Sequence, residues 1–109
     1  MFADFTATDR WTKKPVHCVY QALIVAIATR HADTIDTKFF VDGAPHVVGL
    51  AHTAFVKFRE KSKRDLTDRE ASFIAAEYLR ERLEEADLRP LYDVPESEVL
   101  RLIAQIGIK

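Results

Sequence analysis

Residues 33–52 read DTIDTKFFVDGAPHVVGLAH, two runs rich in β-branched and aromatic residues on either side of Asp42 and Gly43. Runs of this kind are typical of β-strands, and an Asp-Gly pair between them is a strong local signal for a hairpin. We therefore predict that residues 37–41 pair with residues 46–50.

The predicted pairing decides which side chains share a face of the hairpin. A four-residue Asp-Gly-Ala-Pro loop places Phe39 opposite Val48 and Phe40 opposite Val47. Both faces then carry large apolar groups, and an isolated two-stranded ribbon is only marginally stable in water. We expect helices, a third strand or a second copy of the protein to complete it. The side chains expected at a contact between copies are Phe39, Phe40, Val41, Val47 and Val48.

The segment before the hairpin has apolar residues at helical spacing. From Val16 to Arg30 they recur at i, i+3, i+4 and i+7, and Pro15 suits the first turn of a helix. The many β-branched residues favour a buried strand instead. Between the two interpretations we predict a helix that is buried on more than one side, preceded by an irregular segment over residues 1–14.

Three more helices and one short strand are expected after the hairpin. Apolar spacing predicts helices over residues 53–61, 68–86 and 95–106. The second begins at a capping box, TDRE at residues 67–70, whose first and last side chains each accept a backbone N–H. Residues 88–92 form at most an edge strand, because Pro90 does not fit inside a sheet. The prediction is a helix-rich α+β fold in one domain, residues 1–109.

Composition limits the classes of function. The 109 residues include 16 Lys and Arg and 17 Asp and Glu, for a net charge of -1, so no global field attracts nucleic acid or a membrane. The longest apolar run, residues 22–28, is far shorter than the roughly 20 residues that a membrane-spanning helix needs. A lone cysteine, Cys18, suits a reducing compartment, and the first residues have no targeting pattern. We expect a cytoplasmic protein.

The charges are unevenly distributed along the chain. Residues 57–64 carry +4 and residues 77–98 carry -5. A charge run at a helix end is usually a solvated connection, but opposite charges on separate segments also fit contacts between copies. Nucleic-acid binding is a further interpretation, in which Trp11 and Phe58 stack on bases. The basic residues that would contact phosphate are Lys57, Arg59, Lys61, Lys63 and Arg64.

No catalytic or metal-binding motif is present in the sequence. Cys18 is the one candidate thiol nucleophile, and the neighbouring His17 would point about 100° away from it on a helix. His31, His46 and His52 form no pair at i, i+4, so a metal site would have to be assembled from distant residues. We therefore expect no catalytic residue, no metal and no cofactor.

These patterns predict a small, non-catalytic interaction protein that self-associates through its hairpin region, with a dimer as the favoured state. One alternative is a nucleic-acid-binding accessory protein that uses the basic residues of 57–64. Another is a small-ligand binder or enzyme with a pocket between the first helix and the hairpin, near Cys18, Tyr20 and His46.

Overall fold

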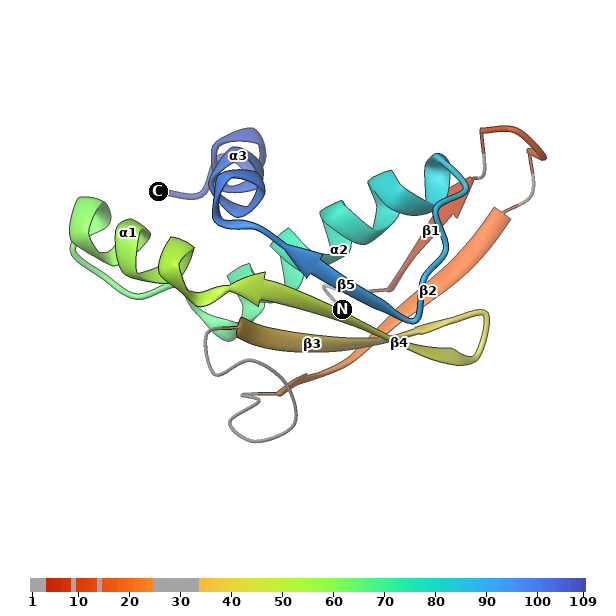
Figure 1. The fold of residues 1–109 in the computed structure, drawn as a ribbon, viewed down its shortest axis with the longest axis horizontal. Helices are drawn as coiled ribbons and strands as arrows, with labels where there is room; N and C mark the ends of the chain where they lie inside the picture. The colour runs from red at the N-terminus through yellow and green to blue at the C-terminus, as the bar shows by residue number, and fades with distance from the viewer. Residues whose placement is uncertain (1–3, 9, 14, 25–33) are drawn as a thin grey trace.

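The computed structural model describes residues 4–8, 10–13, 15–24 and 34–109 (Figure 1). Within them the chain forms, in order, β1 (Asp4–Thr8), β2 (Pro15–Ile24), β3 (Thr34–Val41), β4 (Ala44–Ala51), α1 (His52–Ser62), α2 (Asp68–Glu84), β5 (Leu91–Val94) and α3 (Glu96–Ile106). The five strands make one sheet in the order β1-β2-β3-β4-β5. Neighbouring strands are antiparallel except β4 and β5, which are parallel. The α+β class is confirmed.

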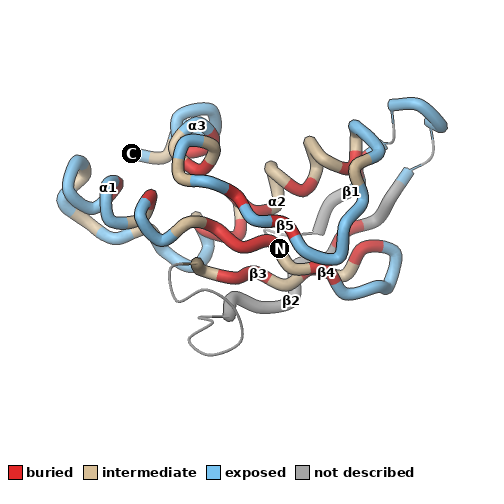
Figure 2. Tube along the Cα trace, viewed as in Figure 1, coloured by how far each residue is buried: buried red, intermediate tan, exposed pale blue. Residues whose placement is uncertain are grey.

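The helices pack on one face of the sheet, as Figure 1 shows for the β3–β4 ribbon. On β3 this face carries Thr37, Phe39 and Val41, all buried. The buried positions in Figure 2 continue on β4 and β5 and on the sides of α2 and α3 that meet the sheet. Fully buried core side chains are Phe39, Val48, Leu50, Ile74, Leu79, Val99 and Leu102. Each large apolar side chain buried in this way stabilises the fold by about 1.5–3 kcal/mol.

The predicted helix over residues 16–30 is wrong for the part that the structure describes. Residues 15–24 form strand β2, paired with β1 on one side and β3 on the other. A bulge between Tyr20 and Ala22 shifts the register, so positions on one face of β2 are three residues apart there instead of two. A spacing of three residues between apolar positions on one face resembles the spacing of a helix, and this is why the sequence pattern favoured a helix. Residues 25–30 of the predicted helix lie outside the described residues.

The N-terminal segment also differs from the expectation. Residues 1–14 were expected to be irregular, but Asp4–Thr8 form β1 at one edge of the sheet. Its register opposite β2 places Phe5 beside Cys18 and Ala7 beside Val16. β1 is only five residues long, and it pairs with residues that were predicted to be helical. The sequence pattern within β1 alone therefore did not indicate a strand.

The hairpin forms, but with a different turn and register. The turn is the two residues Asp42 and Gly43, with φ of 49° and 85°, the positive values that a type I′ turn requires. Phe39 therefore lies opposite His46, not Val48, and Phe40 lies opposite Pro45.

The difference concerns Ala44 and Pro45, which the predicted four-residue loop includes and the structure places in β4. Pro45 lies opposite Phe40, at a position that needs no N–H bond to β3. The shift is two residues, so it keeps every side chain on its predicted face. Phe39 shares the buried face with Val48, and Phe40 shares the opposite face with Val47.

The later elements agree closely with the prediction. The three helices begin and end within two residues of the expected bounds, and the edge strand is Leu91–Val94 rather than residues 88–92. In the capping box, Glu70 N–H donates to Thr67 Oγ1 at 3.1 Å and Thr67 N–H donates to Glu70 Oε1 at 2.9 Å. Gly107 ends α3 with a φ of 87°. None of the helices in the described ranges is long and apolar enough to cross a membrane.

Candidate functional site

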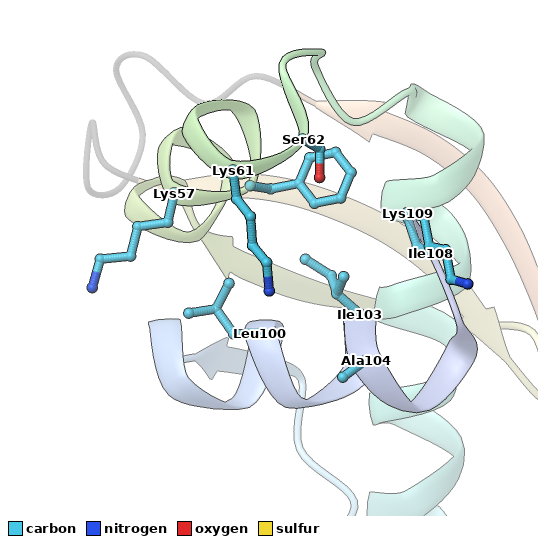
Figure 3. Close-up of a pocket in the computed structure, with 9 residues that line it drawn as sticks. Lys57, Lys61, Ser62, Leu100, Ile103, Ala104, Ile108 and Lys109 are labelled. Atoms are coloured by element: carbon cyan, nitrogen blue, oxygen red, sulfur yellow. The ribbon is translucent and has the colours of Figure 1, made fainter.

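A groove of about 650 Å³ lies between α1 and α3 (Figure 3). Its apolar lining comes from both helices and from the residues that follow α3: Phe58, Leu100, Ile103, Ala104 and Ile108. Ile103 and Phe58 also belong to the hydrophobic core, so the floor of the groove is continuous with the packed interior. The groove is therefore fixed in shape by the same contacts that hold α1 and α3 together.

Three lysines surround this apolar floor: Lys57 and Lys61 from α1, and Lys109 after α3. Lys57 Nζ lies 2.6 Å from Glu96 Oε2. The hydrogen bond to Glu96 raises the pKa of Lys57, and the same bond lowers the pKa of Glu96, so both groups stay charged at neutral pH. Among the described residues, Lys61 has no carboxylate partner. Figure 3 shows its side chain reaching from α1 toward Leu100 and Ile103.

Arg64 holds the last residue of the groove lining, Lys109, in place. Its guanidinium donates to the backbone oxygen of Lys109 at 2.6 Å from Nη2 and 3.2 Å from Nε. Ile108 N–H donates to the Ile103 oxygen at 3.1 Å, which turns the chain back over the end of α3. Residues 108 and 109 are thereby held where they line the groove.

The predicted nucleic-acid contacts are mostly engaged within the protein. Besides Lys57, Arg59 pairs with Asp65 at 3.5 Å and Arg64 pairs with Glu70 at 2.8 Å. This leaves Lys61 and Lys63 as the two cations of the segment without an acidic partner in the described part of the chain. Three of the five predicted cations therefore already have an acidic partner within the protein.

The aromatic side chains proposed to stack on bases are not brought together as a platform. Phe58 is only 5% exposed, and the Arg64 guanidinium lies 5.1 Å from its ring centre. Trp11 is 71% exposed in the connection between β1 and β2. A buried ring covered by an arginine has no free face for a base, so Phe58 does not meet the geometric requirement.

Cys18 lies in the core of the sheet. Its side chain is fully buried, and burial raises the pKa of the thiol to about 12 from its usual 9.0. A thiol with this pKa stays protonated at neutral pH and is a poor nucleophile. The side chain of His17 is outside those that the structure describes.

His46 is the one predicted pocket residue that lines a described cavity. Its ring is buried, and Nδ1 lies 2.5 Å from the carbonyl oxygen of Arg89, so this nitrogen donates a proton to that bond. A small cavity of about 210 Å³ lies beside it, walled by the hairpin turn and the end of α2. The predicted pocket required a helix over residues 16–30 as its second wall, but residues 15–24 form strand β2. The side chain of Tyr20 is outside those that the structure describes.

The other histidines and the carboxylates do not assemble into a metal site in the part of the chain that the structure describes. His52 is exposed at the start of α1, and His31 lies outside the described residues. Within the described ranges, no group of three or more His, Cys, Asp or Glu side chains has the arrangement that a metal ion needs.

The residues expected at a contact between copies fall on two faces. Phe39, Val41 and Val48 are buried under the helices, at most 4% exposed, so they belong to the core. Phe40 and Val47 point to the opposite face, where both are partly exposed.

Neighbouring strands extend this second surface. Leu91 pairs with Val47 and is 40% exposed, and Pro45 opposite Phe40 is exposed. We call Phe40, Pro45, Val47 and Leu91 the helix-free face, because none of the described helices lies over it. The hairpin edges themselves are paired, β3 with β2 and β4 with β5, so a contact between copies through a free hairpin edge is ruled out.

The chain matches no protein-family model, no curated protein and no solved structure. A functional assignment therefore rests on the surfaces themselves. The helix-free face had a sequence signal, the alternation of apolar residues on both faces of the hairpin. Sequence reasoning missed the groove between α1 and α3, for which the available signal was the i, i+4 spacing of Lys57 and Lys61 on the first of these helices.

Proposed function

We propose that the protein is a non-catalytic interaction protein that forms a homodimer through its helix-free face. The observation that carries the proposal is the position of Phe40, an aromatic side chain left partly exposed on a sheet face that none of the described helices covers. Soluble monomers seldom expose contiguous apolar patches unless these serve an interaction.

A second copy is a suitable partner for this face because the face combines apolar side chains with a cation. Lys38 lies next to Phe40, with Nζ 5.7 Å from the ring centre, so a cation and an aromatic ring stand side by side. In a two-fold contact each Phe40 meets the same face of the partner, and Lys38, which lies opposite Val47, is part of that contact. Burying the aromatic and aliphatic groups provides the driving force, at about 25 cal/mol per Å² of apolar surface.

The absence of catalysis in the proposal is supported by the chemistry of Cys18. The buried thiol remains protonated at neutral pH, so it is not prepared for nucleophilic chemistry.

Phe40→Asp tests the proposal, with Val56→Asp as its matched control. Val56 is an apolar residue of α1 that is 43% exposed and outside the helix-free face, so its replacement adds the same charge to a similar surface. We expect Phe40→Asp to shift the protein toward monomer in sedimentation velocity, while Val56→Asp keeps the wild-type mass. Equal behaviour of the two variants, with both folded by circular dichroism, would contradict the proposed face.

A further inference from the structure

We propose that the groove between α1 and α3 is a binding site for a single-chain anionic amphiphile, an aliphatic chain that ends in a carboxylate or a similar anionic head group. This site is separate from the helix-free face, so it adds a second activity to the proposed dimer. Three properties of the groove support it: its size, its apolar floor and the position of its charges.

The size and lining suit the tail of such a ligand. The volume of about 650 Å³ lies within the roughly 300–1,000 Å³ that is typical of small-molecule sites. Phe58, Leu100 and Ile103 give the groove an apolar lining. Leu100 and Ile103 come from α3 (Figure 3). An alkyl chain that lies on this surface removes one side of itself from water. This burial of apolar surface is the main source of affinity for an uncharged tail.

The charges suit the head group. Lys57 is already paired with Glu96 at 2.6 Å, so its charge is compensated. Lys61 and Lys109 have side chains without an acidic partner among the described residues, and both line the groove. An apolar groove whose lining, as described, has two ammonium groups without an acidic side-chain partner favours an anion over a cation of the same shape.

The groove is also organised before binding. Arg64 holds the Lys109 backbone by two hydrogen bonds, and the turn after α3 is closed by the bond from Ile108 to Ile103. A ligand therefore meets a formed site and does not have to order the residues after α3, which reduces the entropic cost of binding.

Three amphiphiles with the same tail separate the contribution of charge from that of the tail. Dodecanoate, dodecanol and dodecyltrimethylammonium are titrated into the whole protein by calorimetry, below the concentrations at which each self-assembles. We expect dodecanoate to bind at one site per chain and to bind more tightly than dodecanol. We expect no saturable binding of the ammonium compound. Equal binding of all three would show nonspecific association and would overturn the proposal.

Two substitutions locate the site. Ala104 lines the groove and is exposed, so Ala104→Trp fills the space without disturbing the core, whereas Gln105→Trp adds the same side chain to the next position of α3, outside the lining. We expect Ala104→Trp to weaken dodecanoate binding at least about tenfold and Gln105→Trp to leave it unchanged.

Lys61→Glu reverses the charge at the groove and is expected to weaken dodecanoate binding about fivefold. Because this variant leaves the apolar floor intact, dodecanol binding is expected to stay the same. Unchanged dodecanoate affinity in both Ala104→Trp and Lys61→Glu would overturn the assignment to this groove. The dimer mass is a separate measurement, so failure of the groove proposal is distinguishable from failure of the helix-free face.

Discussion

Arg64 and Glu70 form a two-point ion pair, in which Nη1 and Nη2 of Arg64 each donate to one Glu70 oxygen at 2.8 Å. The pair joins the residues after α1 to the first turn of α2, where Glu70 also closes the capping box with Thr67. The hydrogen bond from Arg64 makes the largest contribution, and together these hydrogen bonds lower the pKa of Glu70 to about 2 from its usual 4.5. Since Arg64 also holds the Lys109 backbone, one guanidinium connects α1, α2 and the residues after α3.

Arg64→Gln is expected to lower the melting temperature at pH 7. The folded-state pKa of Glu70 is depressed, so the pair stabilises the folded protein above about pH 4.5, and that contribution disappears as the pH falls toward 2. The variant should therefore lose less stability than the wild type over this interval. Thermal unfolding at several pH values between 2 and 7 measures both effects.

Arg59→Gln is the control from the same basic segment. Its ion pair with Asp65 is longer, 3.5 Å, and the two side chains are 71% and 77% exposed. Exposed pairs of this kind contribute little, so no measurable change in melting temperature is expected. A loss as large as that of Arg64→Gln would contradict the special role of the Arg64–Glu70 pair.

Tyr92→Phe is expected to destabilise the protein by about 1–3 kcal/mol, because it removes a buried hydroxyl that both donates and accepts. Tyr92 is 2% exposed, and its hydroxyl donates to the Asp87 oxygen at 2.6 Å and accepts from Arg89 N–H at 2.9 Å. Chemical denaturation measures the change in the free energy of unfolding.

Tyr78→Phe is the matched control, since Tyr78 forms an edge-to-face ring pair with Tyr92 at 6.1 Å. Both variants keep the pair of aromatic rings. Only Tyr92→Phe removes the hydroxyl that hydrogen-bonds to the Asp87 oxygen and the Arg89 N–H. Equal destabilisation by the two variants would indicate that the hydroxyl of Tyr92 is not the stabilising group.

Cys18 should react slowly with thiol reagents in the folded protein and rapidly after unfolding, because burial raises its pKa to about 12. The raised pKa also predicts that the thiol contributes stability below about pH 9, which is lost as the pH rises toward 12. The wild type should therefore lose more stability over this interval than Cys18→Ala. Labelling at neutral pH as fast as that of the denatured protein would overturn the buried assignment.

Binding to nucleic acid, if it occurs, should depend only weakly on salt. Lys61 and Lys63 are the two cations of residues 57–64 without an acidic partner among the described residues, so two phosphate contacts predict a slope of about -1.8 in log K against log salt for double-stranded DNA. Contacts from all five predicted cations would give about -4.5. Fluorescence anisotropy at several salt concentrations measures the slope, and the steeper value would contradict the prediction that only Lys61 and Lys63 contact phosphate.

Local signals predicted the helices well. The Thr67–Glu70 capping box and the glycine at position 107 act within a few residues, so the sequence contains all the information that sets these helix ends. The faces of the hairpin were also predictable, because alternation along a strand depends only on its own residues. Even the wrong turn length left Phe40 and Val47 on the correct face.

Non-local pairing was not predictable in the same way. β2 is a strand because β1 and β3 pair with it on both sides, and its bulge between Tyr20 and Ala22 disrupts the two-residue period that would have identified it. The groove depends on α1 and α3 lying side by side, two helices separated by all of α2 and β5. No pattern within either helix determines that contact.

The mass of the wild-type protein in solution tests the central claim most directly. Sedimentation equilibrium from about 1 µM to about 500 µM covers the range of weak to moderate self-association. We expect a mass that rises with concentration toward twice the 12.5 kDa of one chain and that fits a monomer–dimer equilibrium. A mass that remains 12.5 kDa at the highest concentration would contradict the proposal that the face formed by Phe40 and Val47 joins two copies.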